Sequence, residues 1–298
     1  MLRTGTTLPG TTLPGTTMSS ADQLTLGGMP TRLFSCTPSR LAAFDCPRRY
    51  RFTYLDRPTP PKGPAWAHNT VGAVAHLALA TWWNEPLAQR TPQRGAELVE
   101  RSWGRAGFRD EAQSTRHRRI TAGWVRQYLE DVDPAHEPLG VERTVGAPVG
   151  HLALSGRIDR IDERPAEIVI VDYKTGRRGI GADDARTSQA LALYVLAARR
   201  SLRRDCHRVE LHHLPTGDVV AFEHTEETLA RHVARAEATA DDIQAATDTM
   251  ESGADPDDVF PVATGPGCSW CDFRPSCPEG RAASSQLDPW AALAEAGE

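Results

Sequence analysis

Three consecutive stretches of alternating apolar and polar residues constrain the fold of this chain more than any other feature. They cover residues 142–149, 151–162 and 167–174, and short turn sequences separate them, the last of which contains Pro165. Alternation with a period of two is typical of strands. Short connections join strands that are neighbours and antiparallel. We therefore predict a three-stranded antiparallel meander in the middle of the chain.

Helical periodicity surrounds this meander and indicates the fold class. Apolar residues at helical spacing predict three helices before it and two after it, with two more strands between the last two. The helices are expected at 67–83, 93–105, 111–131, 183–202 and 226–251, and the extra strands near 207–214 and 218–224. Helices on both sides of a strand block predict an α/β (α+β) domain with a central mixed β-sheet flanked by helices.

The chain divides into one large domain and two short terminal segments. Residues 1–30 contain the repeat TTLPGTTLPGTT and few apolar side chains, a composition typical of disorder. Residues 31–280 hold the predicted elements and begin with a helical N-terminal part, in which Pro38 and Pro47 open two short helices. Residues 281–298 form a tail with one short predicted helix.

Bulk properties predict a cytoplasmic protein without a membrane partner. No apolar run approaches the roughly 20 residues that a membrane helix needs. The start of the chain also lacks the basic and apolar parts of a signal peptide. The net charge of −5 gives no overall basic surface, so binding of nucleic acid would depend on a local patch.

Two acids and a lysine in the meander form a pattern that indicates metal chemistry. Asp172 and Lys174 share one face of their strand, with Cα atoms about 7 Å apart. If the hairpin turn centres on residues 164–165, Asp159 lies near Ile170 on the neighbouring strand and both carboxylates reach one point. Converging carboxylates repel each other, and a divalent cation removes that cost. We therefore expect a metal site here.

A single D-x-K triplet is common by chance, and a solvated sheet edge is its ordinary interpretation. Two observations favour a catalytic role. The sequence GRID ends at Asp159, 13 residues before Asp172 across a hairpin. Lysine is also rare, since only Lys62 and Lys174 occur among the 34 basic residues. A lysine at position 174 suggests a task that a guanidinium group performs poorly.

The block SGRIDRIDERPAEIVIVDYKTG resembles the core of RecB-like nucleases of the PD-(D/E)XK superfamily. The resemblance rests on G-x-x-D followed by a strand that ends in V-D-Y-K-T-G. It implies a restriction-endonuclease-like core, in which Asp159 and Asp172 bind Mg²⁺ or Mn²⁺ and Lys174 is catalytic. The backbone carbonyl of Tyr173 is a further candidate metal ligand, and Gly156 is expected to be a close-packing position.

The same resemblance adds candidates outside the meander. The family pattern G-x-x-x-H matches at residues 72–76 and implies that His76 is a metal ligand. Glu142 is a further acidic candidate one strand upstream. Family members often place Gln and Tyr four residues apart on the next helix, but Gln189 and Tyr194 are five apart, a rotation of about 140°. Either that helix is distorted or Gln189 is not the matching residue, and Tyr194 is the safer candidate.

Four cysteines follow a one-plus-three pattern. Cys268, Cys271 and Cys277 lie close together near the C-terminus, and Cys46 lies early in the segment AAFDCPRRYRFTYL. This layout resembles iron–sulfur nucleases, which include AddB-type helicase–nucleases and CRISPR-associated exonucleases. It implies a 4Fe–4S cluster that staples the two ends of the domain together. A four-thiolate zinc site and unligated thiols stay open as alternatives, although structural zinc usually uses two C-x-x-C pairs.

The resemblance covers residues 31–280 and implies a metal-dependent DNA nuclease. The family favours a single-strand exonuclease that acts in DNA repair or recombination. Positive and aromatic side chains are expected to contact the phosphates and stack on the bases. These candidates are Arg48, Arg49 and Arg51 for DNA phosphates, and Tyr50, Phe52 or Trp270 for bases.

Two other functions stay open. The chain is alternatively a catalytically silent nuclease-fold subunit that binds DNA within a helicase–nuclease or a CRISPR-adaptation complex. A zinc-bearing interaction protein is the third hypothesis. The sequence contains no G-x-x-x-x-G-K-[ST] phosphate loop, so any ATP-driven unwinding would come from a helicase partner.

Overall fold

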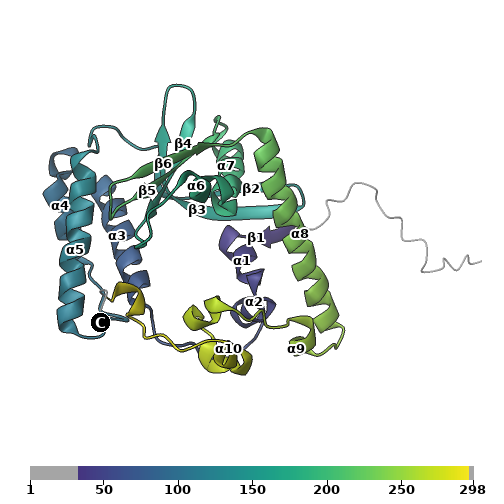
Figure 1. Cartoon of the computed structure of the whole chain (residues 1–298). Coiled ribbons are helices and arrows are strands. Elements are labelled where there is room, and N and C mark those ends of the chain that lie inside the picture. Colours follow the sequence, from purple (N-terminus) through teal and green to yellow (C-terminus); the bar gives the residue numbers. More distant parts are fainter. Residues whose placement is uncertain (1–32, 295–298) are drawn as a thin grey trace, which may run out of the picture. The chain divides into compact units, whose positions relative to one another are not determined.

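A six-stranded mixed sheet lies at the centre of the computed structural model, which describes residues 33–294 (Figure 1). The prediction of disorder for residues 1–30 lies outside that range. The strand order is β1-β3-β4-β5-β6, and β2 pairs with β3 off this path. The strands are β1 (Phe34–Cys36), β2 (Gly140–Val149), β3 (Leu152–Glu163), β4 (Ile168–Lys174), β5 (Arg208–His213) and β6 (Val219–Glu223).

Strands β2, β3 and β4 form the antiparallel meander that the alternating sequence predicts. The predicted register was wrong by two residues, because Ile161 pairs with Ile170 and the turn closes with a hydrogen bond from Arg164 N to Glu167 O, 2.9 Å. The turn therefore centres on residues 165–166. A shift of two residues keeps every side chain on its expected face.

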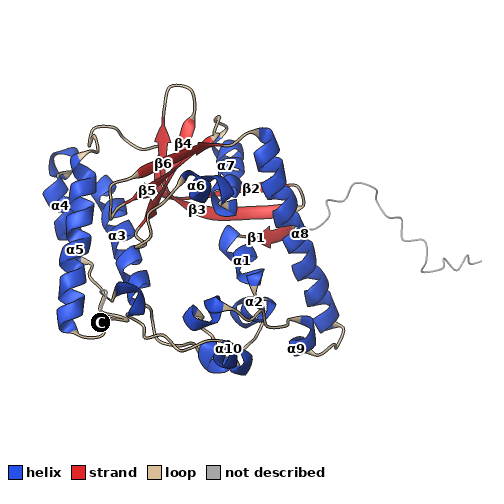
Figure 2. Cartoon of the chain, viewed as in Figure 1, coloured by secondary structure: helices blue, strands red, loops and turns tan. Residues whose placement is uncertain are grey.

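Helices cover both faces of the sheet, which confirms the predicted mixed sheet flanked by helices (Figure 2). One core joins the sheet to α1, α7 and α8, and a second core joins it to α3, α4 and α5. The α-helices of the described range are α1 (Pro38–Ala42), α2 (Pro47–Tyr54), α3 (Ala67–Asn84), α4 (Pro92–Arg101), α5 (Glu111–Glu130), α6 (Ala182–Thr187), α7 (Gln189–Leu202), α8 (Glu226–Glu251), α9 (Pro256–Val259) and α10 (Pro278–Ala283).

One predicted helix is divided in the structure. Residues 183–202 form α6 and α7, which are separated at Ser188, where the backbone is extended (φ −66°, ψ 104°). The Ser188 hydroxyl accepts a hydrogen bond from Leu191 N at 3.3 Å and caps α7. Serine favours such caps over helix interiors because its side chain competes for backbone hydrogen bonds. A helical pattern in the sequence does not reveal this break.

The segment after α10 packs against α3. Pro289 O accepts a hydrogen bond from Ala67 N at 3.0 Å, and Leu293 packs in a small apolar cluster with Val71. Arg177, which follows β4, donates to Ala294 O at 2.7 Å. These contacts connect the C-terminal segment to the start of α3 and to the loop after β4. No helix among residues 33–294 is long and apolar enough to cross a membrane.

Candidate metal centre

The candidate site lies where β3 and β4 separate. On one edge, β3 pairs with β1 through residues 152–154 and with β4 through residues 160–163. Within the described range, residues 155–159 have no strand partner on that edge. At the fork, Asp159 Oδ2 accepts a hydrogen bond from Tyr173 N at 2.9 Å. A carboxylate therefore takes the place of the backbone acceptor that a continued ladder would supply.

The three residues expected to be catalytic meet at this fork. Ile161 faces Ile170, and Asp159 and Asp172 each lie two residues beyond that pair, so both carboxylates are on one face of the sheet. Lys174 Nζ lies 2.5 Å from Asp172 Oδ2. Burial raises the pKa of Asp172, and the nearby Asp159 carboxylate raises it further against the opposing charge of Lys174. The fork thus concentrates negative charge that one ammonium group partly balances.

His76 reaches the fork from α3. Its Nδ1 lies 3.3 Å from Asp159 Oδ2 and its Nε2 lies 3.1 Å from Tyr173 O. Burial alone would lower the pKa of His76, but the Asp159 carboxylate and its acidic neighbours raise it. Gly72 permits this approach, since a Cβ atom there would lie only 3.2 Å from Thr175 Oγ1. The G-x-x-x-H pattern therefore combines a close helix–loop contact with an imidazole at the fork.

Glu142 completes the cluster from the third strand. Val141 pairs with Arg160 and Arg143 with Ile158, so Glu142 lies opposite Asp159 in the β2–β3 ladder. Its backbone is left-handed, with φ 46°. Its Oε2 also lies 2.8 Å from Arg157 Nε. Burial raises the pKa of Glu142, and the charge of Asp159 adds to that shift.

The donor atoms at the fork fit a divalent metal ion. Ligand atoms of His76, Glu142 and Asp159 all lie within 4.8 Å of one another, and no other such group of metal-ligating side chains occurs in residues 33–294. Carboxylate oxygens suit Mg²⁺ and Mn²⁺, and an imidazole nitrogen is a common ligand of divalent transition-metal ions. Tyr173 O lies beside His76 as a fourth donor. Asp172 is outside this group of three, and its carboxylate is paired with Lys174.

A groove of about 940 Å³ contains the fork. One face of α3 forms a wall of it, with His68, Gly72, His76 and Ala80 at four-residue spacing. Tyr194 from α7 lines the opposite part.

Gly156 leaves room for the Tyr194 ring, since a Cβ at this glycine would be 2.2 Å from Tyr194 Cε1. This contact agrees with the close-packing position that the GRID motif predicted. Gln189 is the first residue of α7 and does not line the groove, so the structure brings only Tyr194 to the site.

Two groove residues were missed in the sequence. Arg157 pairs with Glu142, and His68 lies two helical turns before His76. The G-R-I-D motif itself contains the arginine, and the four-residue spacing of His68, Gly72 and His76 would have placed the histidines on one helix face. Both signals were present in the sequence. Arginine and histidine are too common, however, for either residue to be identified as part of a site before the groove is known.

Two of the three arginines expected to contact DNA are buried. Arg48 is buried and its Nε donates to Phe260 O at 3.0 Å, and Arg51 is buried and pairs with Asp257 at 2.8 Å. Both side chains connect α2 to the segment around α9. These contacts supply partners for their charges, which allows the two arginines to be buried. Arg49 is half-buried and donates to Ala42 O at 3.0 Å.

The aromatic candidates separate in the same way. Tyr50 and Phe52 lie in apolar cores and cannot stack on a base from there. Trp270 is 40% exposed. Among residues 33–294, it is the only aromatic residue whose large apolar side chain is exposed. Trp270 alone therefore keeps the expected stacking role as a prediction.

The four cysteines of the one-plus-three pattern gather between α2 and α10. Cys46, Cys268 and Cys271 line one small hollow. The sulfur atoms of Cys277 and Cys268 would lie 3.2 and 3.7 Å from a Cβ at Gly280. Backbone N–H groups point at two of the sulfurs, from Ala263 to Cys46 (3.5 Å) and from Gly280 to Cys277 (3.3 Å). These residues come from opposite ends of the domain.

Comparison with protein families gives one match. The model of the PD-(D/E)XK nuclease superfamily matches residues 35–278, which include the fork, the groove and all four clustered cysteines. Comparison with curated proteins gives no match.

Proposed function

This chain belongs to the PD-(D/E)XK nuclease superfamily, and we propose that it is a RecB-type DNA nuclease that cleaves single strands as an exonuclease in DNA repair or recombination. The superfamily comprises nucleases that use divalent metal ions to hydrolyse phosphodiester bonds, and the six-stranded mixed sheet is its restriction-endonuclease-like fold. The observation that carries the proposal is the convergence of Asp159, Asp172 and Lys174 at the open edge of β3.

Each side chain at the fork has a proposed role. Asp159, Asp172 and His76 hold Mg²⁺ or Mn²⁺, with Glu142 and the Tyr173 carbonyl as additional ligands. When bound, the ion supplies polarisation of the phosphodiester and a water of lowered pKa. Lys174 is 45% exposed, so its ammonium group can turn from Asp172 to the groove, where it orients the attacking water and stabilises the added charge on the phosphate.

The groove along α3 is the proposed path of the DNA strand. Trp270 lies with its ring centroid 5.7 Å from that of His68, which lines the groove, and 5.1 Å from that of Trp66. His68 precedes His76 by two turns, or about 12 Å along the helix. A base that stacks on Trp270 would thus lie a short distance from the metal site. Stacking on a flat aromatic surface requires an unpaired base, which favours single strands.

We also propose that Cys46, Cys268, Cys271 and Cys277 bind a 4Fe–4S cluster. Cys46, Cys268 and Cys271 line one hollow, and the sulfur atoms of Cys268 and Cys277 both lie near Gly280. Structural zinc usually draws on two C-x-x-C pairs, whereas this chain offers one such pair with two further cysteines, which supports a cluster. A cluster here would join α2 to the C-terminal loops.

Digestion of end-labelled and circular DNA tests the catalytic proposal. Wild type should degrade linear single strands with Mg²⁺ or Mn²⁺, and circular single strands should survive because an exonuclease needs an end. Asp172→Ala should abolish cleavage through loss of a metal ligand. Lys174→Ala should reduce it by on the order of 10²- to 10³-fold through loss of charge stabilisation. Lys62→Ala, at the other lysine of the chain, is the matched control and should be fully active.

Two results would contradict the proposal. Equal cleavage by wild type and both site variants would remove the fork as the catalytic centre. Tight metal-independent binding of single strands without any cleavage would instead favour a catalytically silent DNA-binding subunit.

A further inference from the structure

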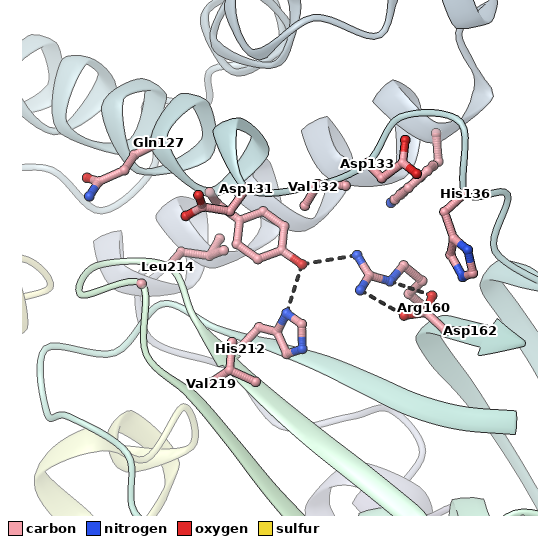
Figure 3. A pocket seen from close by; sticks show the side chains of 13 residues that line it. Gln127, Asp131, Val132, Asp133, His136, Arg160, Asp162, His212, Leu214 and Val219 are labelled. Atoms are coloured by element: carbon pink, nitrogen blue, oxygen red, sulfur yellow. Dashed lines mark hydrogen bonds and ion pairs between the residues drawn. The ribbon is translucent and has the colours of Figure 1, made fainter. Parts of the chain in front are cut away.

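A buried polar network lies directly behind the metal centre, on the other face of the sheet. Arg160 forms two contacts with Asp162, Nε to Oδ1 at 2.8 Å and Nη2 to Oδ2 at 3.0 Å. Its Nη1 donates to Tyr128 Oη at 3.0 Å and to Tyr173 Oη at 3.1 Å. Tyr128 Oη in turn lies 2.8 Å from His212 Nδ1. Figure 3 shows Arg160, Asp162 and His212 around a cavity of about 310 Å³.

The network continues along β5. His212 Nε2 lies 3.2 Å from Glu210 Oε2, and that carboxylate also binds Arg164 at 2.8 Å. The guanidinium of Arg160 lies over the ring of Trp83 from α3, with Arg160 Cζ 5.5 Å from the ring centroid. The side chains therefore come from α3, α5, β3, β4 and β5, and three of these elements, α3, β3 and β4, also contribute residues to the fork.

Tyr173 connects this network to the metal centre through its own backbone. Its side chain points away from Asp172 and Lys174, since neighbours along a strand face opposite sides. Its N–H holds the Asp159 carboxylate at 2.9 Å and its carbonyl oxygen lies 3.1 Å from His76 Nε2. The hydroxyl at the other end of the same residue is held by Arg160. One residue thus carries a side-chain anchor on one face of the sheet and two backbone contacts to site residues at the open edge of the strand.

Stability alone does not account for so many charges in this position. Arg160 and Asp162 are each 6% exposed, and burying an ion pair contributes little or nothing relative to apolar residues of the same size. A fully hydrogen-bonded polar network does, however, hold its members in one arrangement. In this sheet the network holds Tyr173, whose backbone contacts two proposed metal ligands, Asp159 and His76.

We propose that the Arg160–Tyr128–Tyr173 network is a positioning device for the metal centre. Arg160 and Tyr128 fix the Tyr173 ring, and the ring fixes the amide and carbonyl that orient Asp159 and His76 at the fork. This inference rests on the proposed nuclease function, because it assigns these residues to the binding of its metal ion. Tyr173 and its two partners are positioning residues that touch neither the metal nor the DNA with their side chains.

Removal of single hydroxyl groups tests the proposal. Tyr173→Phe and Tyr128→Phe keep the ring volume. The first removes the contact to Arg160, and the second removes the contacts to Arg160 and His212. Mn²⁺ affinity is measured by calorimetry on the full chain without DNA, beside cleavage over a range of Mn²⁺ concentrations and the thermal midpoint. Both variants should bind Mn²⁺ about 10- to 100-fold more weakly, as is typical when a group that orients metal ligands is lost. Excess Mn²⁺ should restore most of the cleavage.

The control is Tyr50→Phe. Tyr50 is equally buried, and its hydroxyl accepts from Arg40 Nε at 2.9 Å, far along the chain from the fork. It should lose a similar amount of stability and keep wild-type Mn²⁺ affinity.

Each result decides a separate point. Wild-type Mn²⁺ affinity in Tyr173→Phe would overturn the positioning role and leave the nuclease proposal intact. Weaker binding that is matched in Tyr50→Phe would also overturn it, because the effect would then follow stability. If wild type binds Mn²⁺ no better than Asp159→Ala, the metal centre itself is wrong and both proposals fail together.

Discussion

Glu142 lies opposite Asp159 in the β2–β3 ladder with a left-handed backbone, at φ 46°. A non-glycine residue in this region costs on the order of 1 kcal/mol or more, and such residues gather at functional sites. The conformation interrupts the ladder at the position where Glu142 and Asp159 lie opposite each other. Glu142 thereby joins His76 and Asp159 in one group of ligand atoms. The left-handed backbone therefore supports the proposal that Glu142 is a metal ligand.

Substitution of Glu142 should separate metal affinity from stability. Glu142→Gln keeps the shape of the side chain and removes one of the converging negative charges. Burial and the neighbouring Asp159 carboxylate disfavour that charge, as the raised pKa of Glu142 indicates. Without metal the variant should thus be at least as stable as wild type in urea unfolding. Its Mn²⁺ affinity should fall roughly tenfold, which is about 1.4 kcal/mol.

The matched control for this prediction is Glu251→Gln, at an exposed glutamate on the last turn of α8. This variant should change neither the stability in urea unfolding nor the Mn²⁺ affinity. An unchanged Mn²⁺ affinity in Glu142→Gln would exclude the residue from the metal centre.

The strands, the long helices and the residues at the fork were predictable from the sequence. Alternation over β2, β3 and β4 is a strong signal, because both faces of each strand are specified along its whole length. The spacing of Asp159, Asp172 and Lys174 within two neighbouring strands predicted that they would lie together, and the resemblance to RecB-like nucleases implied their roles. Their exact register was not predictable, since a turn of four residues can centre on either of two positions without changing which face each side chain occupies.

Other features depended on contacts that no local pattern contains. β1 has three residues, too few for a period to appear. The arginine-rich helix that contains Arg48 and Arg51 is typical of phosphate binding. Only the contacts to Phe260 and Asp257 show that these two arginines connect α2 to the segment around α9. The left-handed backbone of Glu142 depends on the ladder around it and leaves no trace in residue type.

Trp270 should determine preference for unpaired bases. Trp270→Ala should weaken single-strand binding by roughly tenfold, within the 1–3 kcal/mol typical of one stacked base, and leave duplex binding unchanged. Fluorescence anisotropy with labelled oligonucleotides measures both. Trp270→Phe should recover most of the loss because it keeps an aromatic surface. Leu87→Ala, at another exposed apolar residue outside the groove, is the control. Equal loss for duplex and single strands would reject a stacking role.

The protein should lose stability in mild acid through His224. Burial lowers the pKa of His224 to about 4, and His232 and Arg199 add to the shift. The unfolded chain takes up this proton near pH 6.5, whereas the folded protein takes it up only near pH 4. Protonation therefore favours unfolding, and the stabilisation present above pH 6.5 should be lost as the pH falls toward 4.

Urea midpoints at pH 7.5, 6.0 and 5.0 measure this loss. His224→Gln should flatten the dependence, because glutamine takes up no proton. His136→Gln, at an exposed histidine, should leave the slope as in wild type. A slope that is the same in wild type and in His224→Gln would assign the acid sensitivity to other groups.

Loss of one clustered cysteine should remove iron and destabilise the junction between the two ends of the domain. Cys277→Ala should yield colourless protein without iron. It should unfold more easily by on the order of 3 kcal/mol, because a crosslink that closes a very long loop no longer restricts the unfolded chain. Cys206→Ala is the control, since Cys206 lies in the large apolar core beside the sheet, which contains none of the four clustered cysteines. Iron analysis and the visible absorbance of the purified protein decide the outcome. Equimolar zinc without iron in the wild type would replace the cluster with a zinc site.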